Sequence, residues 1–258
     1  MVVTMRSSHS RFMLSFAESL ASVHPSCSLE DFDCGVFVRA CVPSPRALFS
    51  FCLPSEGGPC ARFTREAAEH LACRQANGVI WDFDEVGAEE FGFCDARVQV
   101  EALQNVRLMH LTPRAYNQQY AARGRGSVYR LGNKVNPGAY RALHDVQCEN
   151  FGLGELGVAE RAYVLEQELF RSGRQRAVVV FSDGIPVASG NMWIEGQMAC
   201  LFWIYTLRRV RGHGFGGQVV QELCRWAAEC ECREVLLQAT MAGEKLYKQL
   251  GFQDDGGA

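Results

Sequence analysis

Residues 208–217 hold the chain's densest set of groups suited to binding an anion. Glycine occupies four of the six positions from Gly212 to Gly217, and three arginines precede them. Glycine lets the backbone approach a ligand closely and adopt unusual φ angles. The amphipathic stretch 218–230 predicts a helix that begins here, and the first N–H groups of a helix face outward with the positive end of its dipole. A phosphate group binds at such a place without a metal, so the sequence predicts a pyrophosphate site.

The loop admits two other interpretations. Gly212-His213-Gly214-Phe215-Gly216-Gly217 formally matches the dinucleotide pattern GxGxxG. A dinucleotide fold places that pattern after its first strand, but only 41 residues follow Gly217 here. The next expected strand also ends in Gln238-Ala239-Thr240, without an acid for a ribose hydroxyl, which argues against a dinucleotide site. A glycine-rich turn without a ligand is the remaining alternative, and it leaves the glycines unexplained.

The elements that must position the loop have clear patterns. Helical spacing predicts helices over 137–151 and 157–170. Apolar runs separated by turn residues predict an antiparallel meander of three strands, and Asp183-Gly184 is the strongest hairpin signal in the chain. The glycine loop, a long helix, a fourth strand and a short helix then follow. The expected strands are 176–182, 185–194, 197–207 and 234–239, and the short helix is 243–250.

The loop and the C-terminal stretch together are similar to a known family. Arg211-Gly212-His213-Gly214-Phe215-Gly216 resembles the acetyl-CoA motif R/Q-x-x-G-x-G/A of the GNAT superfamily of N-acetyltransferases. The stretch 239–252, with Leu246-Tyr247 and Leu250-Gly251-Phe252, resembles that family's closing element. The strand order before the loop agrees with the family's meander. The resemblance covers about residues 125–258 and does not include residues 1–115.

The resemblance implies an α/β (α+β) fold with a mixed, mostly antiparallel sheet flanked by helices, and acetyl-CoA as the donor. In the family the coenzyme lies in a splay between the strand before the loop and the strand after the long helix. Its pyrophosphate meets backbone N–H groups of the loop, and its pantetheine pairs with the strand. Tyr247 occupies the position of the tyrosine that faces the departing sulfur. The implied coenzyme contacts are Ile204, Tyr205, Thr206, Arg211, Gly212, His213, Gly214, Phe215, Gly216 and Gly217.

Acetyl transfer requires the same groups. A neutral amine attacks the thioester carbonyl, and a strand N–H near Thr206 could stabilise the oxyanion. A tyrosine hydroxyl, with an ordinary pKa of about 10, is a competent general acid for the departing thiolate, so Tyr247 is the expected catalytic residue; an amphipathic core tyrosine is the alternative. We expect His213 beside a phosphate or in solvent. No residue stands out as the base for the amine, for which a water chain competes with three glutamates: Glu166, Glu168 and Glu195.

The first half of the chain has weaker signals. Residues 1–115 contain ten basic and fourteen acidic residues. The stretch 113–137, rich in Gly, Asn, Gln and Arg, predicts a connector or a surface excursion, so we expect a domain boundary within about ten residues of residue 115. Residues 1–115 are then expected to be an accessory α/β domain that shapes the acceptor pocket, or alternatively a degenerate second copy of the GNAT fold without the glycine loop. Residues 116–258 are the acetyltransferase domain. The expected N-terminal elements are helices over 12–23 and 64–74, the latter capped by Thr64, and strands over 35–41, 47–53, 78–83 and 97–102.

Composition excludes several classes of protein. The chain has 258 residues, 48% of them apolar, and a net charge of −3, so it lacks a general basic field for nucleic acid. No window reaches the roughly 18 uncharged apolar residues of a membrane helix. The twelve cysteines include no CxxC pair, and the histidines have no metal-binding spacing. Buried free thiols and no metal are therefore expected.

Together these features predict a cytoplasmic acyltransferase, an N-acetyltransferase that uses acetyl-CoA. Its partner would be an amine on a small molecule, a peptide or a protein, with neither nucleic acid nor a membrane involved, and a homodimer is common among relatives. Two alternatives stay open: a module that binds coenzyme A without catalysis, and an interaction protein with a vestigial fold. A mitochondrial transit segment around Arg6 and Arg11 is the alternative to the cytoplasm.

Overall fold

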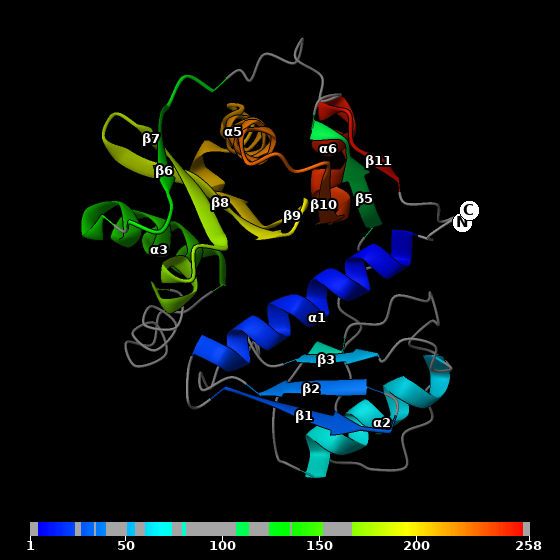
Figure 1. Ribbon diagram of the computed structural model, residues 1–258. Coiled ribbons are helices and arrows are strands. Elements are labelled where there is room, and N and C mark those ends of the chain that lie inside the picture. The colour runs from blue at the N-terminus through cyan, green and yellow to red at the C-terminus, as the bar shows by residue number, and fades with distance from the viewer. Residues whose placement is uncertain are drawn as a thin grey trace. The chain divides into compact units, whose positions relative to one another are not determined.

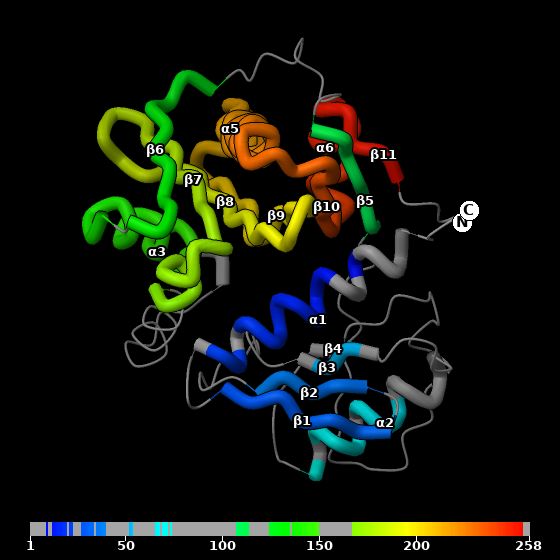
Figure 2. Tube along the Cα trace, viewed as in Figure 1, coloured from blue at the N-terminus to red at the C-terminus, as the bar shows by residue number. Residues whose placement is uncertain are grey.

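The computed structural model divides the chain into two compact units, residues 1–104 and residues 105–258, each with its own sheet (Figure 1). The division falls before the boundary expected near residue 115, because the strand at 107–111 pairs within the second unit. The structure describes residues 5–23, 27–33, 35–39, 51–54, 60–73, 79–80, 107–113, 124–134, 136–151 and 167–254 (Figure 2).

The second unit is built on a seven-stranded sheet in the order β11-β5-β10-β9-β8-β7-β6. All neighbouring pairs are antiparallel except β9 and β10, which run parallel. This is the mixed, mostly antiparallel sheet that the family resemblance implies. The strands are β5 (Arg107–Leu111), β6 (Ser127–Leu131), β7 (Gln175–Ser182), β8 (Ile185–Glu195), β9 (Met198–Thr206), β10 (Glu234–Ala239) and β11 (Gln253–Asp254).

Strands β7, β8 and β9 form the expected meander. In the first turn Asp183 and Gly184 have φ angles of 52° and 77°, the pair of positive values that a two-residue type I′ turn requires. In the second turn Gly196 has a φ of 56°. The sequence prediction of these strands and of β10 is confirmed to within one residue at each end.

Two helices cover opposite faces of the meander (Figure 1). On β7, Val178 and Val180 share a core with α5, whereas Ala177 and Val179 share a core with α3. Successive strand residues point to opposite faces, so the sheet separates two apolar cores. The helices of this unit are α3 (Pro137–Phe151), α5 (Phe215–Glu229) and α6 (Met241–Leu250), the last of which follows β10.

Helix α5 packs closely on β8 at Gly190. A Cβ on Gly190 would lie 2.7 Å from Val219 Cγ1 and 3.2 Å from Leu223 Cδ1, both on α5. Real Cβ atoms do not approach other atoms as closely as the first distance, so glycine at this point of β8 sets the separation of helix and sheet. The position of α5, and with it the position of the glycine loop, depends on this contact.

The prediction of a connector or a surface excursion over 113–137 is wrong in part. Strand β6 occupies residues 127–131 and pairs along its length with β7. Its first three residues are exposed, so it lacks the apolar alternation that marks a half-buried strand. Strand β5 is likewise absent from the sequence prediction, although it pairs with β10 along its whole length.

The first unit has a four-stranded sheet in the order β1-β2-β3-β4 and two helices. Strands β1, β2 and β3 are antiparallel, and β4 runs parallel to β3. Thr64 lies inside the second helix, which begins at Cys60, so the prediction that Thr64 caps it is wrong. The elements are α1 (Met5–Val23), β1 (Ser28–Phe32), β2 (Gly35–Arg39), β3 (Phe51–Pro54), α2 (Cys60–Cys73) and β4 (Val79–Ile80).

Some sequence predictions fall outside the described residues. They include the strand at 97–102, most of the helix at 157–170, the end of the strand at 35–41 and more than half of the strands at 47–53 and 78–83. Residues 167–170 of that helix are described and are helical. These predictions remain predictions for the other residues.

Most of the described cysteines are packed inside the units. Five of the eight cysteines whose side chains the structure describes are buried, and Cys73 is the exposed exception to the expectation of buried thiols. Burial raises the pKa of the Cys200 and Cys224 thiols to about 12, so both behave as small apolar core residues. Within the described ranges, every helix is too short or too polar to span a bilayer.

Candidate functional site

Strand β9 contains a bulge near its end. Ser189 of β8 pairs with Tyr205, but Asn191 pairs with Phe202, so β9 has one more residue than β8 between these pairs. Trp203 has a φ of 51°, which is uncommon for a residue other than glycine. A bulge of this kind re-aims the residues that follow it, which here are the last three of the strand.

Strands β9 and β10 pair over only part of their length. Pairing joins Met198–Leu201 to Glu234–Leu237, although β9 continues to Thr206. Beyond Leu201, the edge of β9 on the β10 side has no strand partner among the described residues. The strands therefore part just before the bulge and leave an open edge of β9 that leads to the glycine loop.

Thr206 presents its backbone to this open edge. The Leu207 N–H donates to the Val187 carbonyl at 3.0 Å, so Leu207 directs its backbone toward β8. Neighbouring strand residues direct their backbone groups to opposite sides, so those of Thr206 point away from β8. The Thr206 carbonyl accepts a hydrogen bond from Arg211 Nε at 3.1 Å. A ligand lying in the split would therefore meet the Thr206 N–H.

The glycine loop ends at the start of α5. Gly212 and Gly214 have φ angles of 82° and 87°, and Gly214 is the N-cap of the helix. The first helical hydrogen bond runs from the Gln218 N–H to the Gly214 carbonyl at 3.1 Å. The N–H groups of residues 215–217 lie outside the intrahelical ladder, and among the described residues no side chain caps them. They are free to bind an external acceptor.

Three elements meet beside these N–H groups. A Cβ on Gly216 would lie 3.1 Å from Thr206 Oγ1 and 3.7 Å from Leu246 Cδ2. Thr206 ends β9, Gly216 lies in the first turn of α5, and Leu246 lies on α6. The structure thus brings the open strand edge, the uncapped amides and the C-terminal helix into contact.

The charges around the loop favour an anion. Arg208, Arg209 and Arg211 are exposed, and the first turn of α5 contains no acidic residue. Arg209 forms an ion pair with Glu149 of α3 at 3.3 Å. The positive end of the α5 dipole adds to the field of the arginines. A diphosphate is therefore favoured here on electrostatic grounds.

His213 lies on the exposed surface of the loop. Its Nδ1 is 3.1 Å from the carbonyl oxygens of Val210 and Arg211. Both oxygens are acceptors, so Nδ1 carries the hydrogen and donates it. The ring also stacks on Phe215, with centroids 6.4 Å apart, and Phe215 is itself buried in the core. These contacts fix the ring and make Nε2 its outward nitrogen.

The predicted coenzyme contacts on β9 face two sides of the sheet. Ile204 packs toward α5, where its Cγ1 would lie 3.1 Å from a Cβ on Gly190. Tyr205 is buried on the α3 side with Val146, and the Arg211 guanidinium lies 5.2 Å from the centroid of its ring. Its backbone belongs to the pair with β8. Tyr205 thus directs no group into the split and instead supports Arg211.

Tyr247 lies on α6 in the core on the α5 side of the sheet. A Cβ on Gly243 would lie 2.7 Å from its Cε2, so glycine makes room for the ring. The ring makes a T-shaped contact with Phe252 at 5.9 Å. Burial raises the pKa of the Tyr247 hydroxyl to about 12. The hydroxyl is therefore protonated at neutral pH and able to donate a proton.

Two of the three candidate bases are engaged on the surface. Glu168 forms an ion pair with Arg171, and Glu195 forms one with Arg174 at 2.9 Å. Glu166 lies outside the described residues. The geometry thus selects neither described glutamate as the base.

Sequence reasoning missed a contact that supports the loop. Gln218 Nε2 donates to the Gly126 carbonyl at 2.6 Å, and the Gly126 N–H donates to Gln218 Oε1 at 3.2 Å. A Cβ on Gly124 would lie 3.0 Å from the carbonyl carbon of Gly214. The segment before β6 is thus held against the first turn of α5. The two glycines are the available signal, but they lie in the stretch interpreted as a connector.

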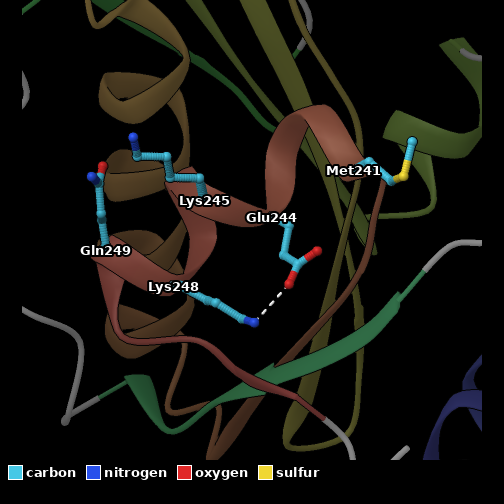
Figure 3. Close-up of a pocket in the computed structure, with 5 residues that line it drawn as sticks. All are labelled: Met241, Glu244, Lys245, Lys248 and Gln249. Atoms are coloured by element: carbon cyan, nitrogen blue, oxygen red, sulfur yellow. Dashed lines mark hydrogen bonds and ion pairs between the residues drawn. The ribbon is translucent and has the colours of Figure 1, made fainter.

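A shallow depression of about 550 Å³ lies on the surface of α6 (Figure 3). Lys248 Nζ pairs there with Glu244 Oε1 at 2.6 Å, and with Asp254 of β11 at 3.1 Å. Neither Tyr247 nor the glycine loop lines it, so it is distinct from the split. Its lining residues are Met241, Glu244, Lys245, Lys248 and Gln249.

Comparison with known families identifies the part of the chain that contains this geometry. Residues 140–252 match the model of the acetyltransferase (GNAT) family. The match takes in most of α3, the meander, the glycine loop, α5, β10 and α6. No curated protein matches the chain.

Solved structures of similar fold extend the comparison. A GCN5-related N-acetyltransferase from Kribbella flavida is 15% identical, with 95% of this chain and 91% of that chain covered and a TM-score of 0.59. A functionally unknown conserved protein from Staphylococcus epidermidis is 11% identical, covers 58% of this chain and has a TM-score of 0.45; this chain spans 57% of it. A predicted acetyltransferase from Clostridium acetobutylicum, solved with acetyl-CoA, is 15% identical, with 50% of this chain and 90% of that chain covered and a TM-score of 0.43.

Proposed function

We propose, from the premise that residues 140–252 form a GNAT acetyltransferase domain, that the protein transfers an acetyl group from acetyl-CoA to a primary amine. One observation carries the proposal: the uncapped amides of α5 open beside a split between two parallel strands. The amides suit a diphosphate, and the split suits an extended amide-containing chain. Coenzyme A has both parts in one molecule.

The donor would lie with its diphosphate on the N–H groups of residues 215–217. Gly212 and Gly214 allow the loop to turn there, and Gly216 keeps the amides accessible beside Thr206. The pantetheine would follow the open edge of β9 past Thr206. The remaining predicted contact residues contribute through the loop backbone, through positive charge or by packing.

The transfer step then uses groups at the end of the split. The amine lone pair attacks the thioester carbonyl, so a C–N bond forms and the C–S bond breaks. The Thr206 N–H, which points away from β8, would stabilise the negative charge on the carbonyl oxygen. The Tyr247 hydroxyl would protonate the departing thiolate. The attacking amine must lose a proton as well, and water serves as the carrier in this scheme.

The acceptor is proposed to be an amine that is a cation in solution and that reacts after it has lost its proton. The N-terminal half has ten basic and fourteen acidic residues, which attracts positively charged partners. Activity should therefore rise with pH as the free amine becomes neutral. A homodimer and a cytoplasmic location are also part of the proposal.

The test is incubation with acetyl-CoA and a panel of polyamines, amino acids and peptides, read by release of free thiol. Amine-dependent release would support transfer. Binding of acetyl-CoA without release for any amine would indicate a coenzyme-binding module instead. Absence of binding, with no rise in melting temperature in saturating coenzyme A, would contradict the proposal, because a ligand of the native state raises its stability.

A further inference from the structure

The N-terminal unit follows the same path as the core of the C-terminal unit. In both, a helix that packs on the meander precedes three antiparallel strands, a second helix follows, and the next strand pairs parallel to the third. The second unit has in addition β6 and a helical segment at 167–171 between α3 and β7. The first unit uses α1, β1-β2-β3, α2 and β4. The second uses α3, β7-β8-β9, α5 and β10.

The agreement extends to strand register and packing. Strand β4 pairs with the start of β3 at Phe51 and Cys52, as β10 pairs with the first half of β9. The preceding helix contacts all three meander strands in both units. Ala67 and Leu71 of α2 share a core with Phe37 of β2, as residues of α5 share one with β8. Figure 1 shows α1 and α2 on the two sides of β1–β3, as α3 and α5 flank the other meander.

The likeness to a solved structure covers both units. The GCN5-related N-acetyltransferase from Kribbella flavida matches 95% of this chain at a TM-score of 0.59, although the family model matches only residues 140–252. The N-terminal unit therefore has a counterpart in that fold without matching the family by sequence. A duplicated module with one diverged copy accounts for both facts.

The junction between the third strand and the second helix differs in its chemistry. From Thr206 to Phe215 the sequence has three arginines and no acid. From Pro54 to Cys60 it has Glu56 and no basic residue. The N-terminal junction therefore lacks the cluster of arginines that favours a diphosphate at the C-terminal junction.

We infer that the two units are copies of one module, and that only the C-terminal copy binds acetyl-CoA, so each chain holds one coenzyme. This inference rests on the proposed function. It assigns to the N-terminal copy a role without coenzyme. It predicts that a substitution at the C-terminal junction weakens binding of the coenzyme, whereas the same substitution at the N-terminal junction does not change it.

The test is calorimetric titration of the full chain with coenzyme A. Wild type should bind one molecule per chain. Gly212→Asp places a carboxylate where a Cβ meets nothing within 4 Å, and should weaken binding about 1,000-fold by repulsion. Gly212→Asn matches its size and its strain at positive φ without the charge, and should weaken binding much less, by about 10-fold. Gly58→Asp, at the N-terminal junction, should bind as wild type does.

The outcomes separate the two levels of the account. Three results would overturn the inference and leave the proposed function standing. They are binding of two molecules per chain, tight binding that remains in Gly212→Asp, and weakened binding in Gly58→Asp while Gly212→Asp is unaffected. No binding by wild type would overturn both. Circular dichroism melts show whether each variant is folded. If Gly212→Asp is destabilised, the melt of Gly212→Asn shows whether backbone strain without the added charge has the same effect.

Discussion

Strands β1–β4 with α2, and strands β7–β10 with α5, have the same order of meander, helix and parallel strand, but the sequences of the two strand-to-helix junctions differ in charge. The comparison separates what makes the fold from what makes the site. Apolar residues at alternating and helical spacing are present in both units and suffice for the fold. The glycines at positive φ, the uncapped amides and the arginines occur together at the C-terminal junction.

The centre of each meander shows a second difference. The middle strand of the first unit places Phe37, fully buried, against α2. The middle strand of the second unit places Gly190 against α5, where no side chain fits. A bulky residue at the first position fills the core, whereas glycine at the second lets α5 approach the sheet.

The largest effect is expected from adding a negative charge at the C-terminal junction. Gly212→Asp should lower affinity for acetyl-CoA about 1,000-fold, and Gly212→Asn only about 10-fold. Equilibrium titration of the two variants side by side isolates charge from backbone strain. Equal weakening by both would show that backbone conformation, and not the anion field, distinguishes the two junctions.

A smaller effect is expected at the residue proposed as the general acid. Tyr247→Phe should lower kcat about 100-fold and leave the Kd for acetyl-CoA within about 3-fold, because only protonation of the thiolate is lost. Steady-state kinetics with an accepted amine, together with titration, gives both quantities. Wild-type turnover in the variant at every pH would return Tyr247 to a packing role.

The contact at Gly190 should affect stability more than binding. Gly190→Ala forces a methyl group against Val219 and Leu223, and should cost about 1–3 kcal/mol of unfolding free energy. Gly132→Ala is the control, since its nearest contact is an ordinary 3.7 Å to Trp226. Urea denaturation compares the two variants. Equal stability would mean that α5 moves away from the sheet at little cost.

The smallest effect is the pH dependence of stability contributed by Tyr247. Burial raises its folded-state pKa to about 12, above the ordinary value near 10. Its contribution to stability is therefore fully present below pH 10 and is lost as pH rises from 10 to 12. Thermal melts should fall more steeply over this range for wild type than for Tyr247→Phe. Parallel curves would contradict the assigned shift.

The sequence predicted those parts of the fold whose residues have a repeating pattern. Asp183-Gly184 and the apolar runs beside it placed the meander to within one residue at each end, and α3 was placed over its observed range. Strand β6 was not predicted, because its first three residues are exposed and its strand conformation depends on pairing with β7. Thr64 satisfied a capping preference, but the helix begins earlier.

The candidate site was predictable in its chemistry and not in its geometry. The glycine loop and its arginines are contiguous, so the role in anion binding that we propose for them followed from residue type and position. The bulge at Trp203 requires a positive φ in a residue that rarely adopts one, so nothing local predicts it. The contact of Gln218 with Gly126 joins residues 92 positions apart, which no local pattern reports.

Amide resonances followed by NMR during titration with coenzyme A test the account most directly. We predict that the largest shifts fall on the N–H groups of residues 212–217 and on Thr206, and that Cys60–Phe63 at the start of α2 do not respond. Shifts centred on α2, or no response at residues 215–217 with saturating ligand, would contradict the placement of the coenzyme.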